Sequence, residues 1–166
     1  MHLRHILIAE DDPCDLELTL NALAENNLAN HVYTVRDGAE ALDYLYCRGK
    51  FATRSGGNPV AMLLDLKMPK VNGIEVLKII KADEYLKTIP VVVLTSSRET
   101  PDVTECYQHG VNAYVVKPVA FAEFMKAINL LGVFWAAVNH PPPPIRRPRP
   151  PGRPIGLAPG LNETPT

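Results

Sequence analysis

The chain has 166 residues, of which 17 are Lys or Arg and 18 are Asp or Glu, so its formal net charge at pH 7 is -1. A chain of this length can bury a hydrophobic core without disulfide bonds. A charge so close to zero excludes a global electrostatic attraction to nucleic acid or to an anionic membrane. We therefore expect no nucleic-acid partner and no membrane partner, and expect recognition to depend on local surface.

The cysteines and the N-terminus indicate a cytoplasmic protein. Cys14, Cys47 and Cys106 form no CxxC pair and have no metal-type spacing, which favours reduced thiols with a packing role in the interior. The first apolar run is only four or five residues long and is followed by acidic residues, unlike a signal peptide or a membrane span.

Short β-branched runs alternate with segments of helical period along residues 1–139. The runs predict strands at residues 4–9, 31–35, 60–64, 91–95 and 113–116. Several of these runs are apolar throughout, as strands covered on both faces are. The alternation predicts βαβ units and a doubly wound, five-stranded parallel sheet.

Helices are expected between these strands. Pro13 and Pro101 stand where a first helical turn tolerates proline. Two segments have apolar residues at positions i, i+3, i+4 and i+7, namely Val103, Cys106, Tyr107 and Gly110, and then Phe121, Phe124, Met125 and Ile128. Residues 47–59 carry three glycines and a proline, and we expect a mobile surface loop there.

The composition changes after residue 139, where most of the prolines of the chain occur. We expect one domain over residues 1–139 and an extended Pro/Arg-rich tail over residues 140–166. The tail could be a solvated linker, a ligand for an SH3-like groove, a nucleic-acid contact, or an arm that docks on a second subunit. The version that we favour is an arm exchanged in a homodimer.

Polar residues follow the expected strands at their carboxyl ends, where parallel sheets bind ligands. Glu10 and Asp11 follow the first strand, and Asp65 follows the third. Thr95 and Ser96 stand at the end of the fourth strand, and Lys117 follows the fifth. Neighbouring carboxylates repel each other unless they bind a proton or a cation, and hard oxygen ligands favour Mg²⁺. A cation, a lysine and a hydroxyl donor are the groups that phosphoryl transfer requires.

Four blocks, ILIAEDD, LLDLKMP followed by NG, VVVLTSS and AYVVKP, resemble in this order the signatures of response-regulator receiver domains. The resemblance covers residues 5 to about 130. It implies a flavodoxin-like fold with strand order 2-1-3-4-5, and a domain in which Asp65 accepts a phosphoryl group from a sensor histidine kinase. It also implies that the chain catalyses only its own phosphorylation and dephosphorylation and is otherwise not an enzyme.

The resemblance implies a role for each matching residue. Mg²⁺ would be bound directly by Asp11 and Asp65, through water by Glu10, and by the backbone carbonyl of Lys67. Phosphoryl oxygens would be bound by Lys117 and Thr95, with Ser96 as the small neighbour that leaves room for the group. Two further expectations are a switch formed by Thr95 and Tyr114 and a cis peptide bond between Lys117 and Pro118.

A narrower resemblance is carried by the glycine-bearing loop, the block IPVVVLTSS and the pair Phe134 and Trp135. These features are similar to single-domain regulators that are paired with bacterial phytochrome kinases. The resemblance implies a phytochrome kinase as partner. With no output domain after residue 139, we expect signalling by changed association, including a homodimer through the fourth and fifth helices.

Several residues have a structural interpretation beside the functional one. Asp12 precedes Pro13 and is interpreted as a helix N-cap instead of a third metal ligand. Tyr114 could be a core aromatic, and the five histidines show no ligand spacing.

Two other functions are alternatives for the whole chain. The first is a Mg²⁺-dependent phosphohydrolase of the haloacid-dehalogenase type, which would need an acid where Lys67 stands. The second is a phosphorylation-independent adaptor, against which the complete set of acidic, hydroxyl and lysine residues argues.

Overall fold

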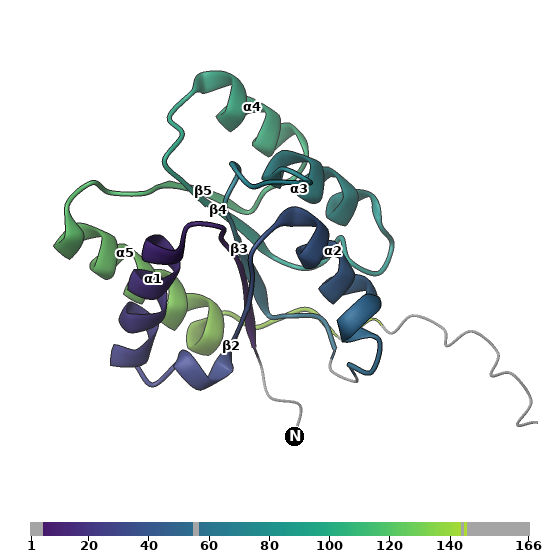
Figure 1. Ribbon diagram of the computed structural model, residues 1–166, viewed down its shortest axis with the longest axis horizontal. Coiled ribbons are helices and arrows are strands. Elements are labelled where there is room, and N and C mark those ends of the chain that lie inside the picture. The colour runs from purple at the N-terminus through teal and green to yellow at the C-terminus, as the bar shows by residue number, and fades with distance from the viewer. Residues whose placement is uncertain (1–4, 55–56, 144, 146–166) are drawn as a thin grey trace, which may run out of the picture.

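A computed structural model describes residues 5–54, 57–143 and 145 of the chain. Five parallel strands in these residues form one sheet of order β2-β1-β3-β4-β5 (Figure 1). The strands are β1 (Ile6–Ala9), β2 (Val32–Val35), β3 (Ala61–Leu64), β4 (Val91–Thr95) and β5 (Ala113–Val116). The expected fold class and strand order are therefore confirmed. The expected start of the first strand, residue 4, lies outside the described residues.

Helices connect the strands, and their first residues explain where they begin. The helices are α1 (Pro13–Glu25), α2 (Gly38–Tyr46), α3 (Gly73–Ala82), α4 (Thr100–Gln108) and α5 (Phe121–Val133). The side chain of Asp12 accepts a hydrogen bond from the backbone N–H of Asp15, which confirms Asp12 as an N-cap. Asn72 and Glu75 form a capping box at the start of α3.

The sheet is covered on both faces. One hydrophobic cluster joins α2, α3 and α4 to one face of the sheet, and a second cluster joins α1 and α5 to the other face (Figure 1). Strands β1, β3 and β4 are buried throughout, which agrees with their apolar sequences. This double layer fixes the strand ends and therefore the positions of the polar residues that follow them.

The expected periodic stripes are only partly buried. Cys106 on α4 and Phe124 and Ile128 on α5 lie in the core, but Tyr107 is 55% exposed and Phe121 is 61% exposed. The predicted helices are therefore confirmed, but these two residues of the periodic stripes lie at the surface. A helix on one layer can bury only the stripe that faces the sheet, and the sequence pattern alone includes residues at the margins of that stripe.

The loop after α2 is less free than the sequence indicates. Residues Gly49–Phe51 form a short 3-10 helix, η2, and the side chain of Phe51 is buried. The centroid of its ring lies 5.2 Å from that of Tyr44 and 5.7 Å from that of Tyr33. The described part of the loop is therefore attached to the core by an aromatic side chain.

Helix α5 continues into a π-helical turn, η3 (Phe134–Val138). The segment Phe121–Val138 is long and apolar enough to cross a membrane by length and composition. In the fold, one face of α5 packs against α1 and the sheet, and the segment consists of α5 and η3. The tail predicted for residues 140–166 lies mostly outside the described residues.

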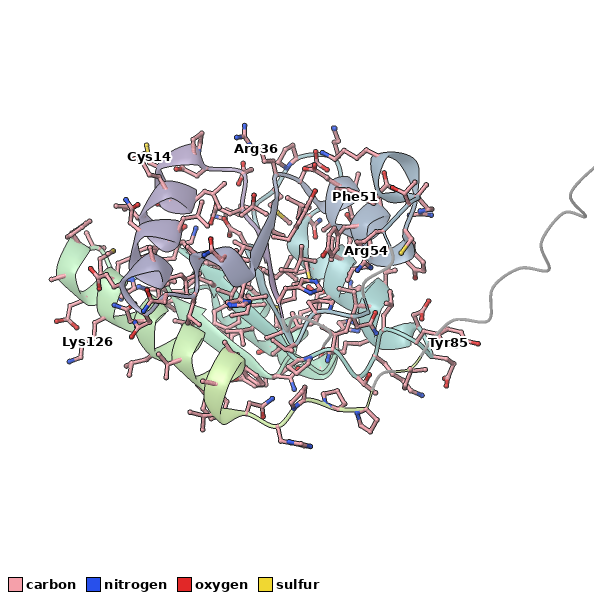
Figure 2. The ribbon with its side chains drawn as sticks, turned by 90° about the horizontal axis from the view of Figure 1, so that it is seen from below. Cys14, Arg36, Phe51, Arg54, Tyr85 and Lys126 are labelled. Carbon is pink, nitrogen blue, oxygen red and sulfur yellow. The ribbon has the colours of Figure 1, made fainter. Side chains whose placement is uncertain are left out.

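The three cysteines are free thiols. Cys106 is buried in the core, and burial raises its pKa to about 11. Cys47 is half-buried and ends α2 in the left-handed conformation, whereas Cys14 is exposed on α1 (Figure 2). The expected packing role therefore applies to Cys106 and is wrong for Cys14.

Candidate functional site

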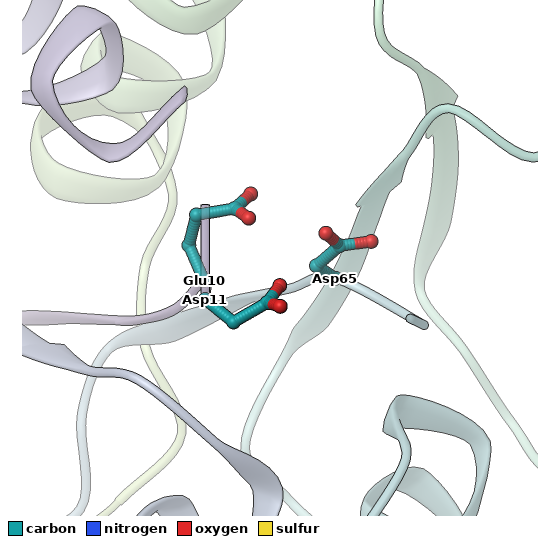
Figure 3. Close-up of side chains that lie close together, drawn as sticks. All are labelled: Glu10, Asp11 and Asp65. Carbon is teal, nitrogen blue, oxygen red and sulfur yellow. The ribbon is translucent and has the colours of Figure 1, made fainter. Parts of the chain in front are cut away.

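Three acidic side chains converge at the carboxyl edge of the sheet. Glu10 and Asp11 follow β1, and Asp65 follows β3. These residues lie side by side because the last residues of the two strands, Ala9 and Leu64, are register partners. One carboxylate oxygen from each acid lies within 4.8 Å of the others (Figure 3). Glu10 and Asp65 are buried and Asp11 is exposed. The structure therefore brings the predicted acids together on one side of the sheet.

This cluster fits a divalent cation of the hard, oxygen-preferring kind. Three carboxylates at this separation repel one another, and a cation among them would remove the repulsion. Because Asp11 is exposed, a bound ion would keep positions open to water and to a phosphoryl oxygen. An ion in this place would neutralise negative charge on an incoming phosphoryl group.

Lys117 supplies positive charge to the same cluster. Its Nζ atom lies 2.6 Å from Oε2 of Glu10, 2.8 Å from Oδ2 of Asp15 and 3.3 Å from Oδ2 of Asp65. Burial lowers the pKa of Lys117, but the hydrogen bonds to Asp15 and Glu10 outweigh burial and raise the pKa above its usual value. Lys117 is therefore a cation at neutral pH.

The charge of the site depends on pH through Glu10. Burial, together with the nearby charge of Asp65, raises its pKa to about 7 from an ordinary value of 4.5 and exceeds the opposing effect of Lys117. Since the folded pKa is above the unfolded pKa, this group stabilises the metal-free fold below pH 4.5, and that stability is lost as the pH rises through about 7.

A divalent cation favours the ionised form of Glu10, so the affinity for Mg²⁺ is expected to increase with pH. Between pH 6 and pH 8 we expect a gain of roughly tenfold, since the ionised fraction of Glu10 rises by about that factor. Calorimetry in buffers of different ionisation enthalpy would measure both the affinity and the released proton. The variant Glu10→Gln should show a flatter profile, and a wild-type affinity that is independent of pH would contradict this prediction.

The loop between β3 and α3 is held tightly behind Asp65. A Cβ atom added at Gly73 would lie 2.1 Å from the backbone oxygen of Asp65 and 2.7 Å from Cα of Leu66. The backbone N–H of Gly73 also donates to the carbonyl of Leu66, at 2.8 Å. Gly73 therefore permits the close approach of backbones that sets the position of Asp65.

Replacing Gly73 by Ala is expected to destabilise the fold and to displace Asp65. Overpacking of this kind typically costs about 1–3 kcal/mol in the free energy of unfolding. The matched control is Gly57→Ala, because a Cβ atom there meets no atom within 4 Å. Urea unfolding of both variants measures the difference, and equal stabilities would show that the loop can move without cost.

Thr95 and the residues after it form a hydrogen-bonded group beside the cluster. Thr95 is fully buried, and its Oγ1 accepts from the backbone N–H of Ser97 at 3.3 Å. Ser97 also donates from Oγ to Oδ2 of Asp102 at 2.5 Å, and its carbonyl accepts from the hydroxyl of Tyr114 at 3.1 Å. Thr95, the start of α4 and Tyr114 on β5 are therefore linked through one residue.

Other predicted residues lie near the site with fewer contacts. Ser96 is exposed at the end of β4. The side chain of Lys67 is exposed, and its backbone N–H donates to Oδ1 of Asp65 at 3.4 Å. The half-buried ring of Tyr114 packs on the core cluster of α2, α3 and α4. The roles of Ser96, of Tyr114 and of the Lys67 carbonyl stay predictions.

One expectation about the backbone was wrong. The described residues contain no cis peptide bond, so the Lys117–Pro118 bond is trans. Lys117 follows β5 and is instead placed by a hydrogen bond to β4, in which its N–H donates to the carbonyl of Thr95 at 2.8 Å, and by its contacts with carboxylates.

Two residues of the site were not found from the sequence. Asp15 reads as an ordinary acid in the first turn of a helix, and its contact with Lys117 joins positions 102 residues apart. Ser97 was overlooked because Ser96 occupies the matching position. Asp15 lies four residues after Asp11, so an acid one helical turn beyond the acidic pair was the available signal.

Residues 6–129 match the family model described as the response regulator receiver domain. Among curated proteins, the probable methanogenesis regulatory protein FilR2 of Methanothrix harundinacea is 37% identical over 84% of this chain and 88% of that protein. The response regulator Rcp1 of Synechocystis is 35% identical over 78% of this chain and 87% of its own length.

Solved structures that are similar to this chain are also response regulators. The bacteriophytochrome response regulator RtBRR is 58% identical with a TM-score of 0.68, and the alignment covers 85% of each chain. The phosphorylated cyanobacterial phytochrome response regulator RcpA is 38% identical with a TM-score of 0.78, over 84% of this chain and 99% of that one. The Mn²⁺-bound form of Rcp1 is 34% identical with a TM-score of 0.78, over 84% and 99% of the two chains.

The fold and the acidic cluster define a phosphoacceptor signalling domain. The chain belongs to the response-regulator receiver family, and it is similar to regulators of phytochrome signalling. It is therefore a receiver that is phosphorylated on aspartate with a sensor histidine kinase as partner, and not an enzyme with a separate substrate. The cluster of Glu10, Asp11 and Asp65 is its divalent-cation site.

Proposed function

We propose that Asp65 is the phosphoacceptor and that the donor is the phosphohistidine of a bacteriophytochrome-type kinase. The observation that carries this proposal is the place of Asp65, which is buried at the end of β3 among two further acids and Lys117. A carboxylate oxygen of Asp65 would attack phosphorus while the bond from phosphorus to the imidazole nitrogen breaks. The histidine nitrogen leaves with the electron pair and then takes a proton from water.

The residues around Asp65 supply the rest of this step. Lys117 would hold a phosphoryl oxygen and offset the charge that builds up there. The carbonyl of Lys67 would complete the ligands of Mg²⁺, and the hydroxyl of Thr95 would bond to the transferred group, with Ser96 leaving space for it. Because Thr95, Ser97 and Tyr114 share hydrogen bonds, movement of Thr95 would be passed to α4 and β5.

The proposed donor can be tested by competition between kinases. We expect a phosphorylated bacteriophytochrome kinase to transfer its phosphoryl group to this chain faster than a sensor kinase of unrelated specificity does. The identities of 58% and 57% to the bacteriophytochrome regulators RtBRR and AtBRR support this choice. Equal transfer from both kinases, at the rate of a small-molecule donor, would rule out the phytochrome assignment. We place this partnership in the cytoplasm.

The output is proposed to be a change in association between two copies of the chain. Helix α5 and η3 carry apolar side chains that are exposed in one copy, namely Leu130, Val133, Phe134 and Val138. A second copy of the chain that packs on this face would bury these side chains. An exchanged arm formed by residues 140–166 would add to this contact.

Replacing Leu130, which is 65% exposed, by Glu should therefore weaken the dimer strongly while the domain stays folded. The matched control is Ile79→Glu on α3, where the side chain is 38% exposed. Light scattering measures the mass of both variants and of a chain that ends at residue 139. The comparison separates the contribution of α5 to the dimer from that of the arm. A wild-type chain that is monomeric at high concentration, with and without phosphodonor, would rule out this output.

A further inference from the structure

The ammonium group of Lys117 is fully engaged before any phosphoryl group arrives. A lysine has three N–H donors, and Lys117 contacts three carboxylates. The two shorter contacts, at 2.6 and 2.8 Å, are with Glu10 and Asp15, and the longest, at 3.3 Å, is with Asp65. A phosphoryl group on Asp65 must therefore compete for this ammonium group.

Asp15 differs from the other two partners of Lys117. Glu10 and Asp65 belong to the cation cluster, so a bound ion would draw their charge away from the lysine. Asp15 lies on α1, outside that cluster, and its backbone is fixed because its N–H donates to Asp12 and its carbonyl accepts from Thr19. Its carboxylate would therefore keep its contact with Lys117 when the ion is bound.

We propose that Asp15 is a positioning residue that shares Lys117 with the phosphoryl group and so limits how tightly that group is held. The inference rests on the proposed function, in which Lys117 binds phosphoryl oxygens. A carboxylate 2.8 Å from the ammonium group offsets its charge and occupies one of its donors. The receiver thereby holds its phosphoryl group less strongly than Lys117 alone would allow.

The variant Asp15→Asn isolates the charge, because Asn keeps the size of the side chain and an oxygen that can accept from Lys117. The probe is beryllofluoride, an anionic analogue of the phosphoryl group, added with saturating Mg²⁺. We expect its dissociation constant to fall by about three- to tenfold, the range for removal of a partly screened charge beside an ammonium group. The gain should shrink as salt is raised, since Asp15 is partly exposed.

Two comparisons separate this role from a general effect of charge or of helix stability. Glu17→Gln removes the same charge from an exposed position on the same helix and should change the dissociation constant by less than about 1.5-fold. In a Lys117→Met background, Asp15→Asn should have no effect, because the effect acts through the lysine. If the Lys117→Met chain does not fold, the salt dependence and the Glu17→Gln control still test whether the effect of Asp15→Asn is local to Lys117.

An unchanged or weaker affinity in Asp15→Asn would overturn the inference, as would an equal gain in the Lys117→Met background. Failure of the proposed function looks different. In that case the wild-type chain would not bind beryllofluoride more tightly than Asp65→Asn does, and the inference would fall with it.

Discussion

Replacing Asp65 by Asn is expected to abolish phosphorylation by acetyl phosphate and by any histidine kinase. The amide nitrogen and oxygen of Asn are poor nucleophiles. Among the described residues, the buried carboxylate that remains is Glu10, which is paired with Lys117. The fold should be retained, because the change preserves shape and removes one of three mutually repelling charges. Intact-protein mass spectrometry in Mg²⁺ measures the added phosphoryl group.

Asp12→Asn is the matched control for this substitution. Asp12 lies beside the acidic pair, and its side chain caps α1, a role that Asn performs equally well. We expect this variant to be labelled at the wild-type rate. Labelling of Asp65→Asn at that same rate would place the acceptor elsewhere, and loss of labelling in Asp12→Asn would show that Asp12 belongs to the cation site.

The variant Lys117→Met should lose about 3–5 kcal/mol of unfolding free energy in the absence of metal at pH 8, the usual cost of breaking a buried ion pair. Lys117 is 9% exposed, and its removal leaves Glu10, Asp15 and Asp65 close together without a cation. The loss should be smaller at pH 6, where Glu10 can hold a proton, since its pKa is raised to about 7. Mg²⁺ should restore part of the stability.

Urea unfolding with EDTA and with Mg²⁺ at both pH values measures these effects. The control is Lys87→Met, which removes an exposed lysine paired with Glu84 and should cost less than about 1 kcal/mol. Labelling of Lys117→Met by acetyl phosphate should also slow by about a hundredfold, because the donor to the phosphoryl oxygens is lost. A metal-free Lys117→Met chain as stable as the wild type would show that the carboxylates do not depend on the lysine.

The sequence predicted the sheet and the acidic cluster because both follow from local patterns. Apolar runs bounded by turn residues predicted β4 and β5 to the residue, and β3 to within one residue. Parallel strands end at the same edge of a sheet, and β1 and β3 are neighbours, so residues that follow these two strands, such as Asp11 and Asp65, lie close together there.

The features that were missed depend on contacts between distant segments. Whether Tyr107 faces the core depends on how α4 is turned against the sheet, which its own period does not fix. The burial of Phe51 depends on Tyr33 and Tyr44, which belong to other elements. The partnership of Asp15 with Lys117 requires α1 and β5 to be in place at the same time.

The three cysteines differ in burial, so the exposed one can be labelled selectively over the buried one. Alkylating reagents attack the thiolate, so Cys106, with a pKa raised to about 11, should stay unmodified in the folded chain at neutral pH. Cys14 is exposed in the first turn of α1, one residue before Asp15. A fluorophore attached there would sit beside the acidic edge of the sheet and could follow cation binding and phosphoryl turnover in real time.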